Sequence, residues 1–137
     1  GDDWADLGDY AWYSDNSDHI THPVGEKLPN AWGFYDCHGN VFEMTWDGYF
    51  YYPEEPVTDP VRDPHNENRM ARGGDFHWGW SYATSSWRGT YTPREKDPNL
   101  GFRIVRYADG GKSGIAGQGA RSGIPVFFSY KSFNLSD

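Results

Sequence analysis

Oxygen-bearing side chains crowd around a glycine turn between residues 30 and 47. Asp36, Gly39, Asn40 and Glu43 fall within eight positions, and an aromatic, strand-like run follows them. A hard cation such as Ca²⁺ takes carboxylate and backbone carbonyl oxygens as ligands, and a turn glycine lets carbonyls converge. The stretch therefore predicts a calcium site. The alternative is that Asp36, Asn40 and Glu43 only accept hydrogen bonds from loop amides.

A second chemically varied stretch follows the double glycine at residues 73 and 74. Aromatic rings can stack on a ligand, while Asp and Arg side chains anchor its polar groups. We predict a ligand-binding surface that contains Asp75, His77, Trp78, Trp80, Tyr82 and Arg88, with Trp87 beside it. The alternative is that some of these tryptophans belong to the hydrophobic core, and for Trp87 the core is favoured.

Asp75 and His77 also form a candidate acid/base pair. Residues two apart on a strand face the same side, and a His near an acidic group suits proton transfer near neutral pH. Asp and His also lie together on many surfaces that have no catalytic role. A catalytic function of this pair is therefore a hypothesis that competes with a purely structural one.

His19 and His22 give an H-x-x-H pattern. Two His at this spacing on a helix could share a metal ion. Pro23 follows at once and no third ligand is in register, so the pattern favours ordinary surface histidines.

Short strands must position these residues. Alternation of apolar and polar residues predicts strands at Val41–Trp46, Arg69–Gly74 and Leu100–Arg106, and strand character returns at residues 124–130. In the strand that begins at Leu100, Phe102 and Ile104 face one side and Arg103 the other.

The remaining elements are shorter or less regular. Residues 2–13 could hold one short helix before Gly8, with Asp2 or Asp3 as the N-cap. The aromatic run Tyr49–Pro53 is interpreted as a cover for the core, in preference to the lining of a groove.

The composition limits the class of fold and of partner. The chain has 137 residues, of which 18% are aromatic, and it contains 17 Gly and 9 Pro. This balance predicts an α+β, loop-rich fold with short strands. A net charge of −8 argues against nucleic acid as a partner. No apolar run reaches membrane-spanning length, and the single Cys37 excludes an internal disulfide framework and a Cys-based zinc site.

Three segments carry a family resemblance: Asn30–Met44, Arg72–Phe76 and Leu100–Arg106. In this order and spacing they resemble the C-terminal half of the formylglycine-generating enzyme, or sulfatase-modifying factor, family. The resemblance covers about residues 10–107. It implies a C-type-lectin-like fold with little regular secondary structure.

The resemblance also divides the chain. Residues 1–107 are the C-terminal part of such a domain, residues 108–123 a Gly- and Ser-rich linker, and residues 124–137 a tail with a possible strand. The family's N-terminal half, with its arginine-leucine-proline-threonine-glutamate helix, has no counterpart here. The resemblance therefore implies a partner, namely that half as a cleaved segment or a separate polypeptide.

The family's ligand sets can be carried over position by position. For calcium, the resemblance implies the Asp36 side chain, the Gly39 and Val41 carbonyls and the Glu43 side chain. The oxidase members also use two cysteines after the double glycine to bind copper. Those positions hold Trp78 and Ala83 in this chain, so copper and cysteine-to-formylglycine oxidation are not expected. Cys37 is interpreted as a small core residue.

Three functions follow from these observations. The first is a non-catalytic or repurposed family member, stabilised by calcium, that binds a small molecule, glycan or peptide at the surface described above. The second is an oxidoreductase-type member that acts with a partner half or a cofactor and uses no cysteine pair. The third is a variable ligand-display protein of the retroelement-diversified kind, which uses the same fold.

Overall fold

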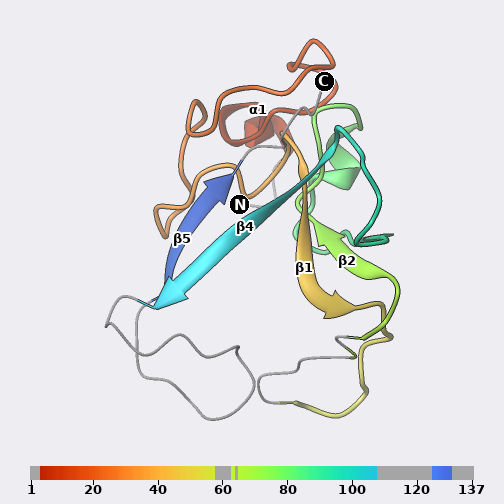
Figure 1. The fold of residues 1–137 in the computed structure, drawn as a ribbon. Coiled ribbons are helices and arrows are strands. Elements are labelled where there is room, and N and C mark those ends of the chain that lie inside the picture. The colour runs from red at the N-terminus through yellow and green to blue at the C-terminus, as the bar shows by residue number, and fades with distance from the viewer. Residues whose placement is uncertain (1–3, 58–62, 64, 108–124, 131–137) are drawn as a thin grey trace.

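Five short strands form one mixed sheet in the order β3-β2-β1-β4-β5, and long irregular loops surround it (Figure 1). The computed structural model describes residues 4–57, 63, 65–107 and 125–130. The elements are η1 Trp4–Asp6, α1 Leu7–Tyr10, β1 Phe42–Gly48, β2 Arg69–Arg72, η2 Trp80–Tyr82, β3 Gly89–Tyr91, β4 Leu100–Tyr107 and β5 Pro125–Tyr130. The predicted α+β, loop-rich class with short strands is confirmed.

The four predicted strands are confirmed as β1, β2, β4 and β5. β1 pairs with β4 in parallel, with Phe42 opposite Leu100 and Met44 opposite Phe102. β2 pairs antiparallel with both β1 and β3, and β4 pairs antiparallel with β5. The register of β1 against β2 shifts between Met44 and Gly48. The sequence did not predict β3, which has only three residues.

The core is built around Phe42 on β1 and the adjoining residues of β2. This ring is 1% exposed, and Met70 and Ala71 from β2 are also buried. Trp87 stacks on Phe42 with 4.7 Å between the ring centroids, which confirms that Trp87 belongs with the core. Aromatic rings bury large areas each, so this pair anchors the segment that leads into β3.

The aromatic run after β1 does not cover the core. Tyr51 is 80% exposed and Tyr52 is 64% exposed, so the interpretation as core cover is wrong. Phe50 and Tyr52 pack edge to face, and so do Tyr49 and Tyr51. The rings of this run therefore pack largely against one another. The sequence pattern does not predict such local packing.

The N-terminal helix runs through Gly8 instead of ending before it. A single 3-10 turn, η1, leads into α1, which ends where the Ala11 N–H donates to the Leu7 carbonyl. Asp2 and Asp3, the predicted N-caps, lie outside the described residues. Asp6 stands at the N-cap position of α1 without a side-chain capping bond.

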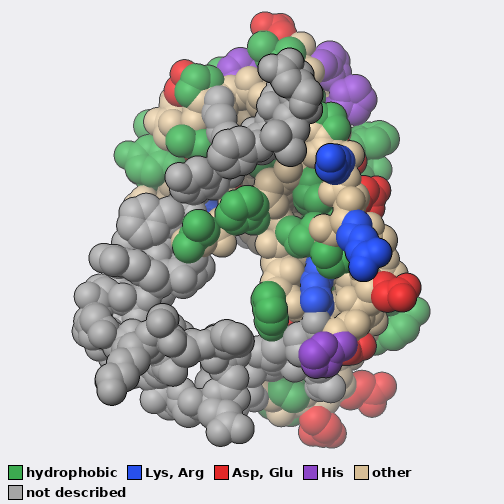
Figure 2. All heavy atoms as spheres, in the orientation of Figure 1, with side chains coloured by type: hydrophobic (Ala, Val, Ile, Leu, Met, Phe, Trp, Pro, Cys, Tyr) green, Lys and Arg blue, Asp and Glu red, His purple; other side chains and the backbone are tan. Residues whose placement is uncertain are grey.

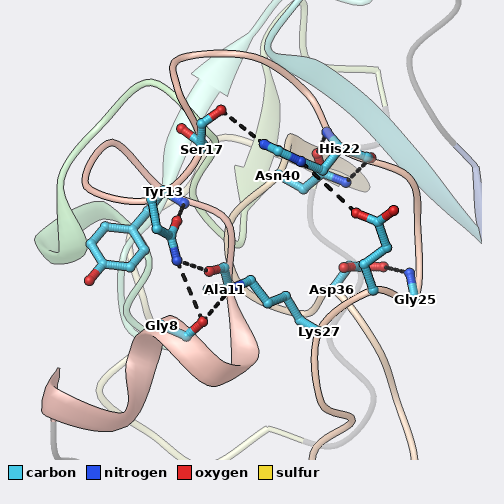
Figure 3. Close-up of polar contacts among 11 residues, drawn as sticks. Gly8, Ala11, Tyr13, Ser17, His22, Gly25, Lys27, Asp36 and Asn40 are labelled. Atoms are coloured by element: carbon cyan, nitrogen blue, oxygen red, sulfur yellow. Dashed lines mark hydrogen bonds and ion pairs between the residues drawn. The ribbon is translucent and has the colours of Figure 1, made fainter.

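Two asparagine side chains hold the loops before β1 together (Figure 3). Asn40 accepts from the His22 N–H at 3.0 Å and donates to the His22 carbonyl at 3.1 Å, as a neighbouring strand would. Asn16 accepts from the Tyr13 N–H and donates to the Ala11 carbonyl. Amide side chains used in this way satisfy backbone groups that no strand or helix pairs.

The predicted linker at residues 108–123 and most of the predicted tail lie outside the described residues. Among the residues that are described, no helix is both long enough and apolar enough to span a bilayer.

Candidate functional site

The predicted calcium loop is a tight turn that touches several other segments. Asp36, Gly39 and Asn40 all have positive φ, at 52°, 72° and 63°. The Gly39 N–H donates to the Gly73 carbonyl, and the Asn40 N–H donates to the Trp12 carbonyl, both at 2.7 Å. A Cβ atom on Gly39 would lie 2.1 Å from the Trp12 carbonyl oxygen, so only glycine permits this approach.

Three charged residues, Asp36, Glu43 and Arg103, make the polar contacts of this loop. Asp36 is 6% exposed, and its carboxylate accepts from the Gly25 N–H at 2.7 Å (Figure 3). Glu43 on β1 forms an ion pair with Arg103 on β4, with Arg103 Nη2 2.6 Å from Glu43 Oε1. The same nitrogen donates to the Tyr35 and Asp36 carbonyls, each at 3.0 Å. The bond to Glu43 raises the pKa of Arg103.

A cation in this loop would share Glu43 with Arg103, which already donates to both Glu43 carboxylate oxygens. A carboxylate has about four acceptor positions, so an ion-paired Glu can still offer an oxygen to a metal. In the described part of the chain, no group of three or more His, Cys, Asp and Glu side chains is arranged to hold a metal. The predicted set differs from such a group, because it has two carboxylates and two backbone carbonyls. Calcium binding here stays a prediction.

Asp75 does not lie on the surface where it was expected. It is 1% exposed, and its Oδ1 accepts from the backbone N–H groups of His77 and Trp78 at 3.1 and 2.9 Å. Burial raises the pKa of this carboxyl group, although the two N–H donors oppose the shift. Its Oδ2 is buried and has no hydrogen-bond partner in the described region. Asp75 therefore shapes the loop from inside.

The strand geometry proposed for an acid/base pair is wrong. Residues 73–79 form a loop after β2, so Asp75 and His77 do not alternate along a strand. The Asp75 carboxylate is turned inward to the loop backbone, while His77 is exposed, with its ring 5.2 Å from that of His19. An Asp that accepts N–H groups two and three residues ahead is an Asx turn, which sequence alternation does not reveal.

Trp78 and Tyr82 begin an aromatic stack that leads from the surface into the core. Trp78 is 45% exposed and stacks on Tyr82 with centroids 5.0 Å apart. Tyr82 contacts Trp87 at 5.4 Å, and Trp87 stacks on the buried Phe42. Part of the predicted ligand surface, His77 with Trp78 and Tyr82, is thus brought together and held by the core.

Trp80 faces a cavity of about 670 Å³ between the N-terminal helix and the segment after β2. Trp80 itself is 50% exposed. The lining combines aromatic rings, hydroxyl groups and one thiol: Trp4, Asp6, Leu7, Tyr10, Leu28, Asn30, Ala31, Phe34, Asp36, Cys37, His38, Trp80, Ala83, Thr84, Ser85 and Ser86.

Three residues of the predicted calcium loop, Asp36, Cys37 and His38, also line this cavity. Cys37 is half-buried at the cavity wall, so it is not the small core residue that was expected, and burial raises the pKa of its thiol. The ring nitrogen Nδ1 of His38 is buried and has no hydrogen-bond partner among the described residues. Burial lowers the pKa of the His38 imidazole. The cavity wall thus holds a protonated thiol and a neutral imidazole near pH 7.

Arg88 lies with a different group of side chains. It donates to the Phe50 carbonyl at 2.8 Å, and its guanidinium lies 4.2 Å from the centroid of the Tyr52 ring. Cation–π contacts of this kind position an Arg against aromatic faces. Arg88 thus packs with the aromatic run after β1, whereas Trp78 and Tyr82 pack toward Trp87, so the predicted surface is divided between two neighbourhoods.

The sequence did not predict which residues from distant segments contribute to the loop and the cavity. Arg103 was placed on the correct side of its strand, but its ion pair with Glu43 required the parallel register of β1 and β4. The cavity depends on Trp4 and Tyr10 facing a segment more than seventy residues further along the chain. No local pattern predicts such contacts.

Comparison with known proteins identifies the family. A family model described as "Sulfatase-modifying factor enzyme 1-like domain" matches residues 1–108. The chain belongs to this family. It is 32% identical over 100 residues to the chaperone protein LppX of Paenibacillus barcinonensis. The aligned region covers 72% of the chain and 32% of LppX.

One further relative and one solved structure are also similar to this chain. The formylglycine-generating enzyme of Streptomyces coelicolor is 35% identical over 94 residues, covering 65% of the chain and 30% of that enzyme. Treponema denticola variable protein 1 has a similar structure, with a TM-score of 0.69 and 33% identity, covering 74% of the chain and 37% of that protein. The chain therefore spans about a third of the length of these relatives. The C-type-lectin-like description of the domain stays a prediction.

Proposed function

We propose that this chain is a repurposed member of the sulfatase-modifying factor family that binds a ligand through aromatic side chains and does not oxidise cysteine. The observation that carries the proposal is the aromatic stack: Trp78 is half exposed, yet it rests on Tyr82 and Trp87, which in turn rest on Phe42. A rigid, exposed aromatic surface binds ligands at a low entropic cost because its side chains are already ordered.

The cavity beside Trp80 extends the proposed binding surface. Its volume of about 670 Å³ falls in the range of sites for small ligands, roughly 300–1,000 Å³. Thr84, Ser85 and Ser86 add hydroxyl groups to an otherwise apolar wall. Aromatic faces combined with hydroxyl donors and acceptors suit a glycan or a short peptide, whose surface alternates apolar and polar groups.

The residues at the two positions where the family resemblance places copper-binding cysteines support a change of chemistry. Copper(I) prefers soft thiolate ligands, and the positions implied for the two cysteines hold Trp78 and Ala83. Trp78 is part of the aromatic stack, and Ala83 is 4% exposed and lines the cavity. Cys37 is the one thiol in the sequence, and its raised pKa keeps it protonated near neutral pH.

The names of the relatives agree with a scaffold that serves several purposes. One is called a chaperone, one a formylglycine-generating enzyme and one a variable protein. A single fold commonly carries different functions on its loops, since the loops change while the body remains. Ligand display on the segment after β2 is the function that fits the exposed aromatic residues of this chain.

Calcium is the cofactor that we propose for the loop at residues 36–43. The ligands would be the Asp36 and Glu43 side chains with the Gly39 and Val41 carbonyls. The ion would add positive charge to a loop that Arg103 already neutralises in part. Millimolar CaCl₂ is expected to raise the melting temperature of the wild type more than MgCl₂ does, because Mg²⁺ demands stricter octahedral geometry. Equal melting curves with and without CaCl₂ would contradict calcium binding.

The remainder of a family domain is the partner that we propose. The chain spans about a third of its relatives, and β4 leaves an apolar side chain, Ile104, 45% exposed on one face of the sheet. Trp46 on β1 is 61% exposed. Hydrophobic side chains are also visible along the middle of the face in Figure 2. Exposed apolar surface of this kind marks an interaction site.

A dye-binding measurement tests this apolar face. The isolated chain should bind 8-anilinonaphthalene sulfonate in its folded state, and Ile104→Lys should reduce the fluorescence without loss of secondary structure. Exposed Tyr51→Lys, which lies in the loop after β1, is the control and should change the fluorescence less. Absence of dye fluorescence with the wild-type chain would contradict an uncovered docking face.

Glycan and peptide arrays test the proposed ligand surface. The wild type should bind a defined subset of array members, and Trp78→Ala should lose them. Trp46→Ala removes another exposed tryptophan, one that lies on β1, and should keep them. A parallel assay with copper and a cysteine-containing peptide should yield no formylglycine. Binding at background level on both arrays, or formation of formylglycine, would overturn the proposal.

A further inference from the structure

Two exposed imidazole rings from distant parts of the sequence face each other at one end of the molecule. The rings of His19 and His77 have centroids 5.2 Å apart and an interplanar angle of 59°. Figure 2 shows His side chains gathered near the top of the molecule in that view. The sequence pattern paired His19 with His22 instead, but His22 is stacked on Trp12 and bonded to the Ser17 carbonyl.

The separation matches what one metal ion would impose on two imidazole ligands. Zinc lies about 2.0–2.1 Å from each ligating nitrogen, and a tetrahedral angle then places the two ring centroids about 5 Å apart. Tilted rings are compatible with this arrangement, since each ring turns freely about its metal–nitrogen bond. Directly stacked rings would not be, because their nitrogens could not converge.

The backbone on both sides of His77 is fixed to the segment that carries His19. The Ser17 hydroxyl, which is fully buried, donates to the Phe76 carbonyl at 2.6 Å and accepts from the His19 N–H at 3.2 Å. The Ser14 N–H donates to the Trp78 carbonyl at 3.1 Å. The two imidazole-bearing loops are therefore held together before any ion binds, which lowers the entropic cost of binding.

We infer that His19 and His77 form a two-histidine site for a divalent transition-metal ion. Imidazole nitrogen suits zinc, copper and nickel, whereas calcium and magnesium prefer oxygen ligands. In the described ranges no third His, Cys, Asp or Glu joins the pair to make a group of three. Two protein ligands leave coordination positions for water or for a donor group of another molecule.

The site adjoins the aromatic surface without depending on it. The His77 and Trp78 rings lie 5.7 Å apart, nearly perpendicular. An ion held by His77 would therefore sit beside Trp78, where its open positions could accept a carboxylate or imidazole of a molecule bound to that ring. Metal binding itself involves only the two His side chains, so it can succeed or fail separately from ligand display.

Zinc titration of the tag-free chain by isothermal calorimetry tests the inference. The wild type should bind one Zn²⁺ per chain. His77→Ala and His19→Asn should each weaken zinc binding at least tenfold, because one imidazole cannot chelate. Asn is chosen at position 19 because its backbone has φ 56°, which Asn tolerates better than Ala does. His65→Ala, which removes an exposed imidazole elsewhere, should leave the affinity unchanged.

A second readout follows the two rings directly. In proton NMR spectra, the imidazole resonances of His19 and His77 should shift together and saturate at one equivalent of zinc. Melting temperatures within about 2 °C of the wild type show that the two variants remain folded. Unchanged affinity in either variant, or zinc-induced shifts that include His65 and spare His77, would overturn the two-histidine site.

Discussion

The loop at residues 36–43 and the segment at residues 75–87 contact each other, but their side chains are used in opposite ways. In the loop, charged groups are turned inward, and Glu43, Arg103 and the Asp36 carboxylate satisfy one another or the backbone. In the segment, a buried Asp75 fixes the backbone and the aromatic rings of Trp78 and Trp80 face outward. The charges of this domain therefore build the scaffold, and its aromatic residues supply the surface.

Breaking the loop should have the largest effect on stability. Gly39→Ala should lower the free energy of unfolding by about 4 kcal/mol, because the new Cβ would overlap the Trp12 carbonyl at a positive φ. Gly25→Ala is a matched control, since Gly25 has φ 80° but open space around its Cα, and should cost about 1 kcal/mol. Urea unfolding measures both. Equal losses would show that Trp12 does not constrain the loop.

Removing the charge inside the loop should come next. Arg103→Met leaves Glu43 and two carbonyls unpaired in a largely buried position and should cost about 3 kcal/mol. Exposed Arg94→Met should change the unfolding free energy by less than about 0.5 kcal/mol. In the double variant Glu43→Gln with Arg103→Met, the loss should be smaller than the sum of the single losses. Additive losses would contradict a coupled pair.

Asp75 should show a smaller effect with a distinctive dependence on pH. Asp75→Ala removes the acceptor for two loop N–H groups and should cost about 1–2 kcal/mol, whereas Asp75→Asn keeps an acceptor oxygen. Because burial raises the pKa of Asp75 in the folded state, folding takes up a proton between the unfolded and folded pKa values. This group's contribution to stability therefore falls as pH rises through that window.

Urea unfolding across a range of pH measures this effect. The stability of Asp75→Asn relative to the wild type should increase as pH rises above the ordinary carboxyl range, near 4, and level off above the folded pKa. A relative stability that is constant between pH 3 and pH 7 would contradict the raised pKa.

Changing the aromatic surface should alter stability least. Trp78→Ala removes a stack on Tyr82 from a side chain that is already half exposed, and should cost about 1 kcal/mol or less. Trp87→Ala is the comparison within the same stack, and should cost at least about 3 kcal/mol because Trp87 lies on the buried Phe42. Thermal unfolding compares them, and similar losses would mean that Trp78 is a structural residue.

The sequence was a sound guide to the strands and a poor guide to exposure. Apolar alternation located β1, β2 and β4, since a half-buried strand shows a period of two along the chain. It also placed the Arg103 side chain on the other face of its strand from Phe102 and Ile104. Asp75 was expected on the surface, because a local hydrogen-bonded turn looks the same in sequence as an exposed polar residue.

Contacts between distant loops lay beyond prediction. Ser17 brings His19 to His77, and the N-terminal helix closes the cavity at Trp80, through packing that no local spacing records. The family resemblance gave the loop and its acidic residues, but the resemblance could not show that Arg103 would share Glu43. The division of the predicted surface between Trp78 and Arg88 likewise required the fold.

The dissociation constant of an array-selected ligand tests the division between scaffold and surface most directly. Trp78→Ala and Trp80→Ala should each weaken binding at least tenfold while their melting temperatures stay within a few degrees of the wild type. Trp46→Ala should leave the dissociation constant unchanged. Full affinity in both Trp78→Ala and Trp80→Ala would contradict the account, because the outward aromatic rings would then have no part in recognition.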